Sequence, residues 1–538
     1  MTPSTAPHAF DSAAPAASVT PLALHAMLGD GAEIAVIDVR EQGVYAEGHL
    51  LLAASLPLSL LELEAPVRLP CRDARIVLID DVAARAERAA RLLRQCGYRQ
   101  VMLLAGGNRA WTQAGLRLFS GLYVPSKAFG ECVEHFHDTP RISAQALLEM
   151  SHVKLPLRLL DSRPMSEVAD FSLPGACGCP GAELLARASG TPADVTIVVN
   201  CAGRTRGIIG AQSLINAGLP NTVYALENGT MGWHLAGLPL DTGAKSLAPL
   251  PEDSAHDAAR AMALNLMHQH GVAVIGEAEL AAMRADCQRT TYLFDVRLPE
   301  AWRVAHRADA LSAPGGQLIQ STDQYAPVRH ARIVLVDDDL VQAPMTAHWL
   351  AQMGWQVAVL QPDLSKNIAS AQGARQGLVL VEPEPTPVIG PSELARRLAA
   401  GSTRVLDCRD SRLYRDGHIA GALFVIRSEL AAVLPNLADQ GGLTFVSDDG
   451  LLARFAAADA RALGCDAVVL DGGYAAWTEA GMDVSRNDAQ YLSAPHDAWY
   501  SPYQLDHGKE QAMRDYIAWE TGLLDHLAEE PGIHFRIA

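Results

Sequence analysis

One two-part pattern occurs four times, and this repeat constrains the fold more than any other feature of the 538 residues. The first part is an apolar run that ends in Asp and has Arg two places further on (Asp38 and Arg40, Asp161 and Arg163, Asp295 and Arg297, Asp407 and Arg409). The second part is a β-rich run, and the next residue is Asp80, Cys201, Asp337 or Ser447. These positions follow the first Asp by 42, 40, 42 and 40 residues, so the parts keep register in every copy.

Each second run leads into a stretch with helical spacing that ends near a glycine (Gly97, Gly218, Gly354 and Gly464). A third β-rich run then leads to a glycine turn and a tryptophan in three copies, at Trp111, Trp233 and Trp477, whereas the third copy lacks this last element. Strands that alternate with helices at this spacing predict an α/β fold with a parallel sheet covered on both faces.

The Asp-x-Arg strand end, the Pro174-Gly175-Ala176 segment, the central strand with its Cys loop and the Gly-Gly-x-x-x-Trp turn resemble the rhodanese homology domain. The resemblance covers residues 18 to 487 and implies four tandem rhodanese-like domains, each a parallel five-stranded sheet with helices on both faces. We name them copies one to four, at residues 18–125, 138–245, 256–365 and 386–487.

Segments rich in Pro, Gly and Ser predict linkers near residues 124–140, 243–255 and 382–391. Residues 488–538 follow copy four, and we expect a helical extension there. Residues 503–529 alternate apolar side chains such as Met513, Tyr516 and Leu523 with Asp and Glu, which indicates an amphipathic helix. Docking onto the domains is the simpler role for this helix, and an oligomer contact is the alternative.

Cys201 opens a loop that we interpret as the active site; the other loop residues are Ala202, Gly203, Arg204, Thr205, Arg206 and Gly207. A thiol between a parallel strand and a helix N-terminus lies where backbone N–H groups favour an anion. Two arginines add positive charge, so we expect a lowered thiol pKa and a nucleophilic thiolate. An ordinary buried cysteine is the alternative interpretation.

The equivalent positions in copies one, three and four cannot form a persulfide, since they hold Asp80, Asp337 and Ser447. An acidic side chain there can cap the free N–H groups of the following helix, and metal binding by these acidic loops is the alternative. Cys177 and Cys179 form a C-x-C pair that we interpret as loop thiols, although a resolving or soft-metal role is open.

The rhodanese resemblance implies sulfane-sulfur transfer from thiosulfate through a Cys201 persulfide to cyanide or a thiol, without cofactor or metal. The alternatives are a 3-mercaptopyruvate sulfurtransferase and a persulfide carrier or scaffold. Cysteine phosphatases and arsenate reductases resemble this loop but have five residues between Cys and Arg, whereas four stand between Cys201 and Arg206. By analogy with two-domain rhodaneses, we expect copy one to cover copy two and copies three and four to form a second pair.

The amino-acid composition limits the kinds of partner that we expect the protein to bind. The chain has 43 Lys and Arg against 61 Asp and Glu, a net charge of -18 that argues against nucleic acid binding. There is no leader-like start and no apolar run of about 20 residues, so we expect no membrane association and a cytoplasmic protein. Nine cysteines, an odd number, fit reduced thiols. The expected partners are small-molecule sulfur donors and acceptors, and homo-oligomerisation is open.

Overall fold

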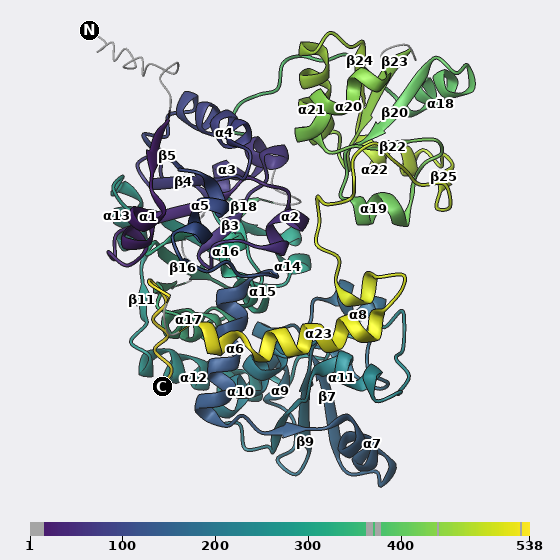
Figure 1. The fold of residues 1–538 in the computed structure, drawn as a ribbon. Helices are drawn as coiled ribbons and strands as arrows, with labels where there is room; N and C mark the ends of the chain where they lie inside the picture. Colours follow the sequence, from purple (N-terminus) through teal and green to yellow (C-terminus); the bar gives the residue numbers. More distant parts are fainter. Residues whose placement is uncertain (1–15, 362–369, 372–377, 438–440, 528–529) are drawn as a thin grey trace.

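The computed structural model describes residues 16–361, 370–371, 378–437, 441–527 and 530–538. Four parallel sheets with one strand order recur along the chain, as the repeat predicts (Figure 1). The strands of copy one run β1-β5-β4-β2-β3, those of copy two β6-β10-β9-β7-β8, those of copy three β11-β17-β16-β12-β14 and those of copy four β19-β24-β23-β20-β22. The predicted five-stranded parallel sheets are therefore confirmed.

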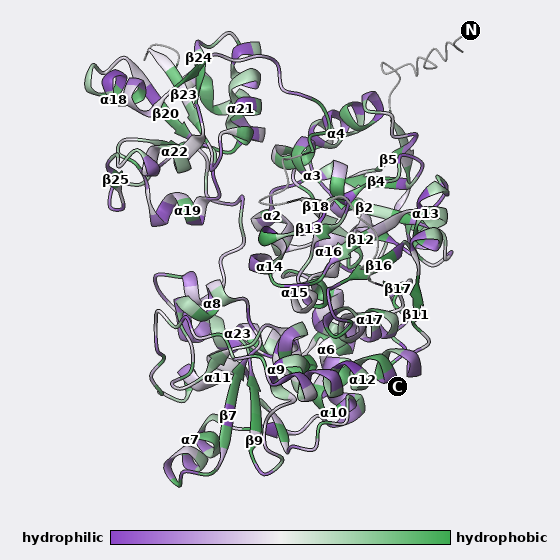
Figure 2. Ribbon diagram, turned by 180° about the vertical axis from the view of Figure 1, so that it is seen from behind, coloured by the Kyte–Doolittle hydropathy of each residue, from purple (hydrophilic) through white to green (hydrophobic). Residues whose placement is uncertain are grey.

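The strands are short. In copy one they are β1 (Ala17–Val19), β2 (Ile34–Asp38), β3 (Ala53–Ser55), β4 (Arg75–Ile79) and β5 (Gln100–Leu104). In copy two they are β6 (Arg141–Ile142), β7 (Leu157–Asp161), β8 (Cys177–Gly178), β9 (Thr196–Asn200) and β10 (Val223–Leu226). In copy three they are β11 (Ala273–Ile275), β12 (Thr291–Asp295), β14 (Leu311–Ser312), β16 (Arg332–Val336) and β17 (Gln356–Leu360). In copy four they are β19 (Val388–Ile389), β20 (Thr403–Asp407), β22 (Leu423–Phe424), β23 (Gly442–Val446) and β24 (Ala467–Leu470). β7 and β9 are hydrophobic along most of their length, as buried parallel strands must be (Figure 2).

Helices cover these sheets. Copy one has α1 (Pro21–Leu28), α2 (Gln42–Glu47), η1 (Leu58–Leu60), α3 (Leu61–Arg68), α4 (Ala83–Gln95) and α5 (Gly107–Gln113). Copy two has α7 (Ala144–His152), α8 (Met165–Asp170), η2 (Gly181–Glu183), α9 (Leu184–Ala188), α10 (Thr205–Asn216) and α11 (Gly229–Leu235). Copy three has α13 (Glu277–Ala285), α14 (Pro299–Val304), α15 (Gly315–Gln320), α16 (Thr322–Tyr325) and α17 (Gln342–Gln352). Copy four has α18 (Pro391–Ala399), α19 (Ser411–Asp416), η3 (Arg427–Glu429), α20 (Leu430–Val433), η4 (Leu434–Leu437), α21 (Leu451–Ala462) and α22 (Gly473–Glu479).

The repeated Asp and Arg form a buried ion pair at the end of one strand of each copy, namely β2, β7, β12 and β20. In copy two, Arg163 Nη2 lies 2.7 Å from Asp161 Oδ2, and both side chains are fully buried. The same Nη2 donates to the carbonyl oxygen of Phe171, eight residues on. Arg40, Arg297 and Arg409 make the equivalent two contacts in the other copies. The pair therefore anchors the chain after the strand, which explains why it recurs in copies without a cysteine.

Two of the predicted linkers include long helices. Most of the linker predicted near residues 124–140 forms α6 (Val124–His137), and α12 (Asp253–Gln269) begins within the second linker. α6 packs against α10, and α12 packs against α9 and α17. These helices form part of the interfaces between copies. The local Pro, Gly and Ser content predicted linkers and did not indicate the helices.

The copies pair differently from the expectation. Copy two faces copy three, where η2 contacts α15 and Trp349 Nε1 donates to Ser213 Oγ at 2.8 Å. Copy one faces copy four through the equivalent elements, since η1 contacts η3 and Arg427 lies 2.8 Å from Glu62. The expected pairing of one with two and three with four is therefore wrong. Copy four forms a lobe beside copy one in Figure 1.

Copy three also joins copy one directly. Its strand β15 (Val328–Arg329) pairs antiparallel with β2 and adds a sixth strand to the sheet of copy one. Tyr292 donates to the carbonyl oxygen of Arg68 at 2.7 Å across the same interface. One hydrophobic core consequently runs through copies one, two and three.

The C-terminal extension crosses several copies. Its first residues form β26 (Gln490–Tyr491), which pairs with β22, so the sheet of copy four reaches beyond the predicted boundary at 487. Next come η5 (Pro502–Gln504), α23 (Lys509–Thr521) and η6 (Leu523–His526), and α23 lies across α6 on the face shown in Figure 1. The predicted amphipathic helix is thus confirmed in kind but is shorter, and residues 528–529 lie outside the described residues.

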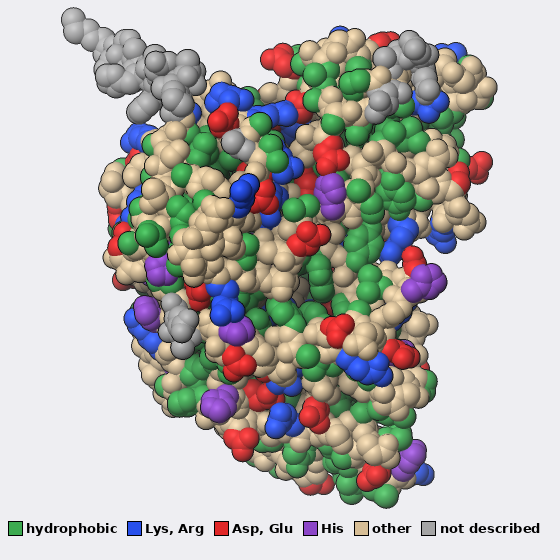
Figure 3. Space-filling view, in the orientation of Figure 1, with side chains coloured by type: hydrophobic (Ala, Val, Ile, Leu, Met, Phe, Trp, Pro, Cys, Tyr) green, Lys and Arg blue, Asp and Glu red, His purple; other side chains and the backbone are tan. Residues whose placement is uncertain are grey.

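No helix in the described ranges is both long enough and apolar enough to cross a membrane. On the face drawn in Figure 3, basic and acidic side chains are interspersed.

Candidate active site

Cys201 lies between the end of β9 and the start of α10, where the sequence predicted it. Its side chain is only 2% exposed. The backbone N–H groups of Gly203 and Gly207 point to the sulfur, and the thiol lies 3.6 Å from the carbonyl oxygen of Arg204. The loop therefore presents two backbone donors and one carbonyl acceptor to the sulfur.

Copies three and four show what this loop geometry binds. The Asp337 carboxylate accepts hydrogen bonds from the N–H groups of Leu340, Val341 and Ala343 at 2.8 to 3.0 Å. Ser447 Oγ accepts from the N–H of Ala453 at 3.1 Å. Ala343 and Ala453 stand six residues after Asp337 and Ser447, as Gly207 does after Cys201. The predicted capping by an acidic side chain is confirmed for Asp337.

Copy one departs from this pattern. Asp80 is bound by Arg85, whose Nη2 lies 2.9 Å from Asp80 Oδ1. Arg85 stands five residues after Asp80, as Arg206 does after Cys201. An arginine at this position can therefore bind an anionic group at the position of the cysteine.

Both loop arginines are held by carboxylates. Arg204 pairs with Glu131 at 2.7 Å and with Glu134, both on α6. Arg206 makes two contacts to Glu167, at 2.7 and 2.8 Å, and a third to Gln317 at 3.0 Å. Arg204 thus fixes the loop to α6, whereas Arg206 is the arginine whose charge acts on Cys201.

The expected lowering of the Cys201 pKa is not observed. Burial raises the pKa of the thiol, and the charge of Arg206 lowers it less. The Glu520 carboxylate raises the pKa further, while the N–H groups of Gly207 and Gly203 lower it. The net pKa lies above the ordinary value because burial of the thiol outweighs the groups that lower the pKa.

The glycine turn of the repeat supports the loop of residues 201–207, which we name the active loop. Gly229 begins α11 with a positive φ of 55°, and a Cβ atom there would lie 2.3 Å from the Cys201 carbonyl oxygen. That oxygen accepts a hydrogen bond from the N–H of Thr230 at 2.8 Å. Gly107 and Gly473 stand equally close to the carbonyl oxygens of Asp80 and Ser447. The turn therefore needs glycine because two backbone segments touch there.

The site includes residues that the sequence analysis missed. Glu520 on α23 is 1% exposed and accepts a hydrogen bond from Thr205 Oγ1 at 2.5 Å. Lys127 on α6 lies 3.6 Å from Glu520 and also contacts the hydroxyl of Tyr516. The Tyr503 hydroxyl lies 3.1 Å from the carbonyl oxygen of Ala202. Glu520 stands seven residues after Met513 and four after Tyr516, so helical spacing could have placed it on the buried face.

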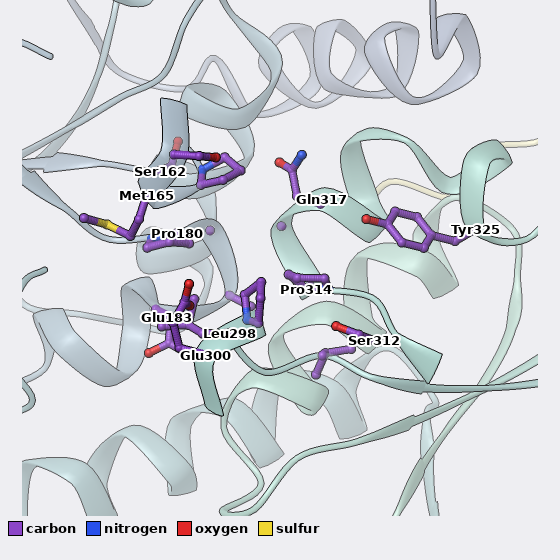
Figure 4. Close-up of a pocket in the computed structure, with 18 of the residues that line it drawn as sticks. Ser162, Met165, Pro180, Glu183, Leu298, Glu300, Ser312, Pro314, Gln317 and Tyr325 are labelled. Carbon is purple, nitrogen blue, oxygen red and sulfur yellow. The ribbon is translucent and has the colours of Figure 1, made fainter. Parts of the chain in front are cut away.

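A cavity of about 410 Å³ lies beside the site, between copies two and three (Figure 4). Copy two contributes Met165 and Glu183, and copy three contributes Leu298 and Tyr325. Gln317 also lines the cavity and connects it to Arg206 through their hydrogen bond. The partner of copy two at this cavity is therefore copy three and not copy one.

Cys177 and Cys179 belong to the body of copy two. Cys177 is half-buried on β8 with its sulfur 3.9 Å from Ser246 Oγ. Cys179 is fully buried, and burial raises the pKa of its thiol well above the ordinary value. Cys179 is therefore a poor nucleophile. The interpretation of both residues as loop thiols is wrong for Cys177, which lies on a strand.

The sequence model of the Rhodanese-like domain matches residues 20–114, 143–236 and 390–480, which together make up more than half of the chain. This protein belongs to the rhodanese-like family. Rhodanese-like copy three is not among the matched segments, although its strand order is the same. Most of the residues that follow β17, where the other copies have the glycine turn, lie outside the described part of the chain.

Two further comparisons place this rhodanese-like chain among known proteins. A thiosulfate sulfurtransferase from Pseudomonas aeruginosa is 42% identical with a TM-score of 0.91, and the match covers 96% of this chain and 99% of that one. The similarity therefore extends to the arrangement of all four copies. An HTH-type transcriptional regulator of Mycobacterium tuberculosis is 36% identical over 86 residues, which are 16% of this chain and 38% of the regulator. The chain thus spans well under half of that relative.

Proposed function

We propose that this protein is a sulfurtransferase in which Cys201 carries the sulfur as a persulfide, received from thiosulfate and passed to cyanide or a thiol. One observation carries the proposal: Cys201 occupies the position at which copy three binds the Asp337 carboxylate through three N–H groups. A loop that binds a fixed carboxylate in one copy is suited to bind a thiolate or a persulfide in another. The similarity to the Pseudomonas aeruginosa thiosulfate sulfurtransferase supports thiosulfate as the donor.

The reaction has two half-reactions. In the first, the Cys201 thiolate forms a bond to the outer sulfur of thiosulfate, the sulfur–sulfur bond of thiosulfate breaks, and sulfite leaves with the bonding electrons. In the second, the acceptor bonds to the outer sulfur of the persulfide, and Cys201 leaves as a thiolate. The N–H groups of Gly203 and Gly207 and the charge of Arg206 stabilise the anionic sulfur in both steps.

3-Mercaptopyruvate is the second candidate donor, and one observation favours it. The two loop arginines suggested a cationic pocket for thiosulfate, but both are paired with carboxylates. Their charge therefore argues less strongly for a dianionic donor. Turnover with each donor, measured at matched concentrations with cyanide as acceptor, decides between them.

The central test is the variant Cys201→Ser. We expect thiosulfate to add the mass of one sulfur atom to the wild-type protein and nothing to the variant, because a serine hydroxyl cannot form a persulfide. Cyanide-dependent release of sulfite should fall to the uncatalysed rate in this variant. Cys177→Ser, at a half-buried cysteine of the same copy, is the matched control and should retain activity.

Two results contradict the proposal. Sulfur bound to Cys177 or Cys179 in Cys201→Ser would show that a second thiol carries sulfur. Wild-type protein without turnover on either donor, yet loaded by the persulfide of another protein, would identify a persulfide carrier.

A further inference from the structure

Glu520 brings a carboxylate from outside the rhodanese-like copies to the active loop. It lies on α23, more than three hundred residues after Cys201, and is 1% exposed. Its negative charge acts on Cys201. A Cβ atom on Gly203 would lie 3.5 Å from its Oε2 atom. The carboxylate therefore packs against the active loop beside Gly203.

The two carboxylate oxygens of Glu520 differ in their hydrogen-bond partners. Oε1 is bound by Thr205 Oγ1 at 2.5 Å and lies 3.6 Å from Lys127 Nζ. Oε2 is buried and has no hydrogen-bond partner. A buried carboxylate oxygen without a donor is unfavourable, so a donor is expected when the site is occupied.

The surroundings hold Glu520 in place. Lys127 contacts the Tyr516 hydroxyl, and its ammonium lies 5.0 Å from the centre of the Tyr516 ring. Although burial lowers the pKa of Lys127, the Glu520 charge and the hydrogen bond to Tyr516 help to raise it above its ordinary value, so the lysine stays charged. The free oxygen is consequently held by α6, α10 and α23 together.

The charges at the site do not favour an anion at Oε2. The cations Lys127, Arg204 and Arg206 are each paired, and the carboxylates that pair with them are Glu520, Glu131, Glu134 and Glu167. Thiosulfate is a dianion without N–H or O–H groups, and so it cannot satisfy Oε2. A sulfur acceptor with an N–H group can supply the donor that this oxygen lacks.

We infer that Glu520 contacts the sulfur acceptor and selects a small thiol that carries an ammonium group. This inference rests on the proposed function. The acceptor thiolate forms a bond to the outer sulfur of the protonated Cys201 persulfide, the bond between the two sulfurs breaks, and Cys201 leaves as a thiolate. The acceptor ammonium donates to Glu520 Oε2 during this step and gives up no proton. Glu520 is thus a specificity-determining residue.

The test uses three thiols of one backbone length and different charge: cysteamine, 2-mercaptoethanol and 3-mercaptopropionate. The full-length protein is loaded with thiosulfate, and the second-order rate constant for discharge of the Cys201 persulfide is measured for each thiol. The thiols differ in intrinsic reactivity. The readout is therefore the rate constant for cysteamine divided by the rate constant for 3-mercaptopropionate, compared between wild type and Glu520→Gln. Glu510→Gln, an exposed glutamate on the same helix, is the control.

In Glu520→Gln we expect the ratio to fall about tenfold or more, because a buried, charge-assisted hydrogen bond is lost. Glu510→Gln should keep the wild-type ratio. The inference is overturned if Glu520→Gln keeps the ratio, or if discharge by all three thiols falls equally. Should Glu520→Gln fail to fold, Glu520→Asp withdraws the carboxylate by one methylene, and an unchanged ratio there also overturns the inference.

The same experiment separates this inference from the proposed function. If thiosulfate adds no sulfur to Cys201 in the wild type, the proposed donor is wrong. The persulfide is then loaded with inorganic polysulfide, and the three thiols still test Glu520.

Discussion

At the scale of single residues, one side chain decides whether a copy can carry sulfur. Asp337 fills its loop with a carboxylate that accepts hydrogen bonds from three N–H groups, and Asp80 is bound by Arg85. Cys201 offers the same loop a group that becomes anionic only on deprotonation or persulfide formation. Under the proposed function, the residue and not the backbone therefore confines the sulfur chemistry to copy two.

The pKa of Cys201 leads to a prediction about pH. Because that pKa is raised, the thiolate forms only as the pH rises above the ordinary value for cysteine, about 8.5, and alkylation of Cys201 should increase through this range. The Glu520 charge raises the pKa, so Glu520→Gln should move the alkylation curve to lower pH. The measurement is the rate of iodoacetamide labelling of the Cys201 peptide by mass spectrometry. A curve that stays in place, or moves to higher pH, would refute the role given to this charge; Glu510→Gln serves as the control.

At the scale of elements, turns and helices far from Cys201 in sequence fix its loop. The turn at Gly229 contacts the loop from one side, and α23 covers it from another through Tyr516 and Glu520. The glycine turn was visible in the sequence as a repeated motif. The cover was not visible, because the helix of the extension and the loop that it contacts lie far apart in the sequence.

The turn predicts a specific loss of activity. Gly229→Ala places a Cβ atom 2.3 Å from the Cys201 carbonyl oxygen and should displace the loop. Gly237 also has a positive φ, of 76°, but no atom lies within 4 Å of its Cβ position. Both variants carry the backbone strain, roughly 1 kcal/mol, that alanine meets at a positive φ. We expect at least a tenfold fall in sulfur transfer for Gly229→Ala and little change for Gly237→Ala; equal activities would contradict the contact.

At the scale of the whole molecule, the copies form the nested pairs two with three and one with four. Equivalent elements meet in each pair, η2 with α15 and η1 with η3. The loop of copy two therefore faces copy three, from which it receives Gln317. Copies without a nucleophile still shape the surroundings of the active loop.

The interface of copies one and four can be tested without touching the active site. Arg427 is 4% exposed and pairs with Glu62, which is 8% exposed. Arg427→Ala leaves a buried carboxylate unpaired and should destabilise the protein by about 3–5 kcal/mol. Arg88→Ala removes a partly exposed pair with Asp459, which keeps its pair with Arg427, and should cost less than about 1 kcal/mol. The measurement is urea unfolding together with sulfur transfer, which both variants should retain at low temperature. Similar free energies of unfolding for the two variants would contradict the stabilising role given to the Arg427 pair. Loss of activity in Arg427→Ala alone would show that copy four contributes to sulfur transfer.

The sequence by itself determined the four sheets, the loop and its cysteine. The reason is that strand periodicity, the Asp and Arg pair and the glycine turn are local patterns whose contacts lie within one copy. The pairing of copies, the carboxylates that neutralise Arg204 and Arg206, and the contact of Glu520 with the loop were decided only by the tertiary structure. They join residues tens to hundreds of positions apart, and no local pattern records which surfaces meet when four similar domains pack.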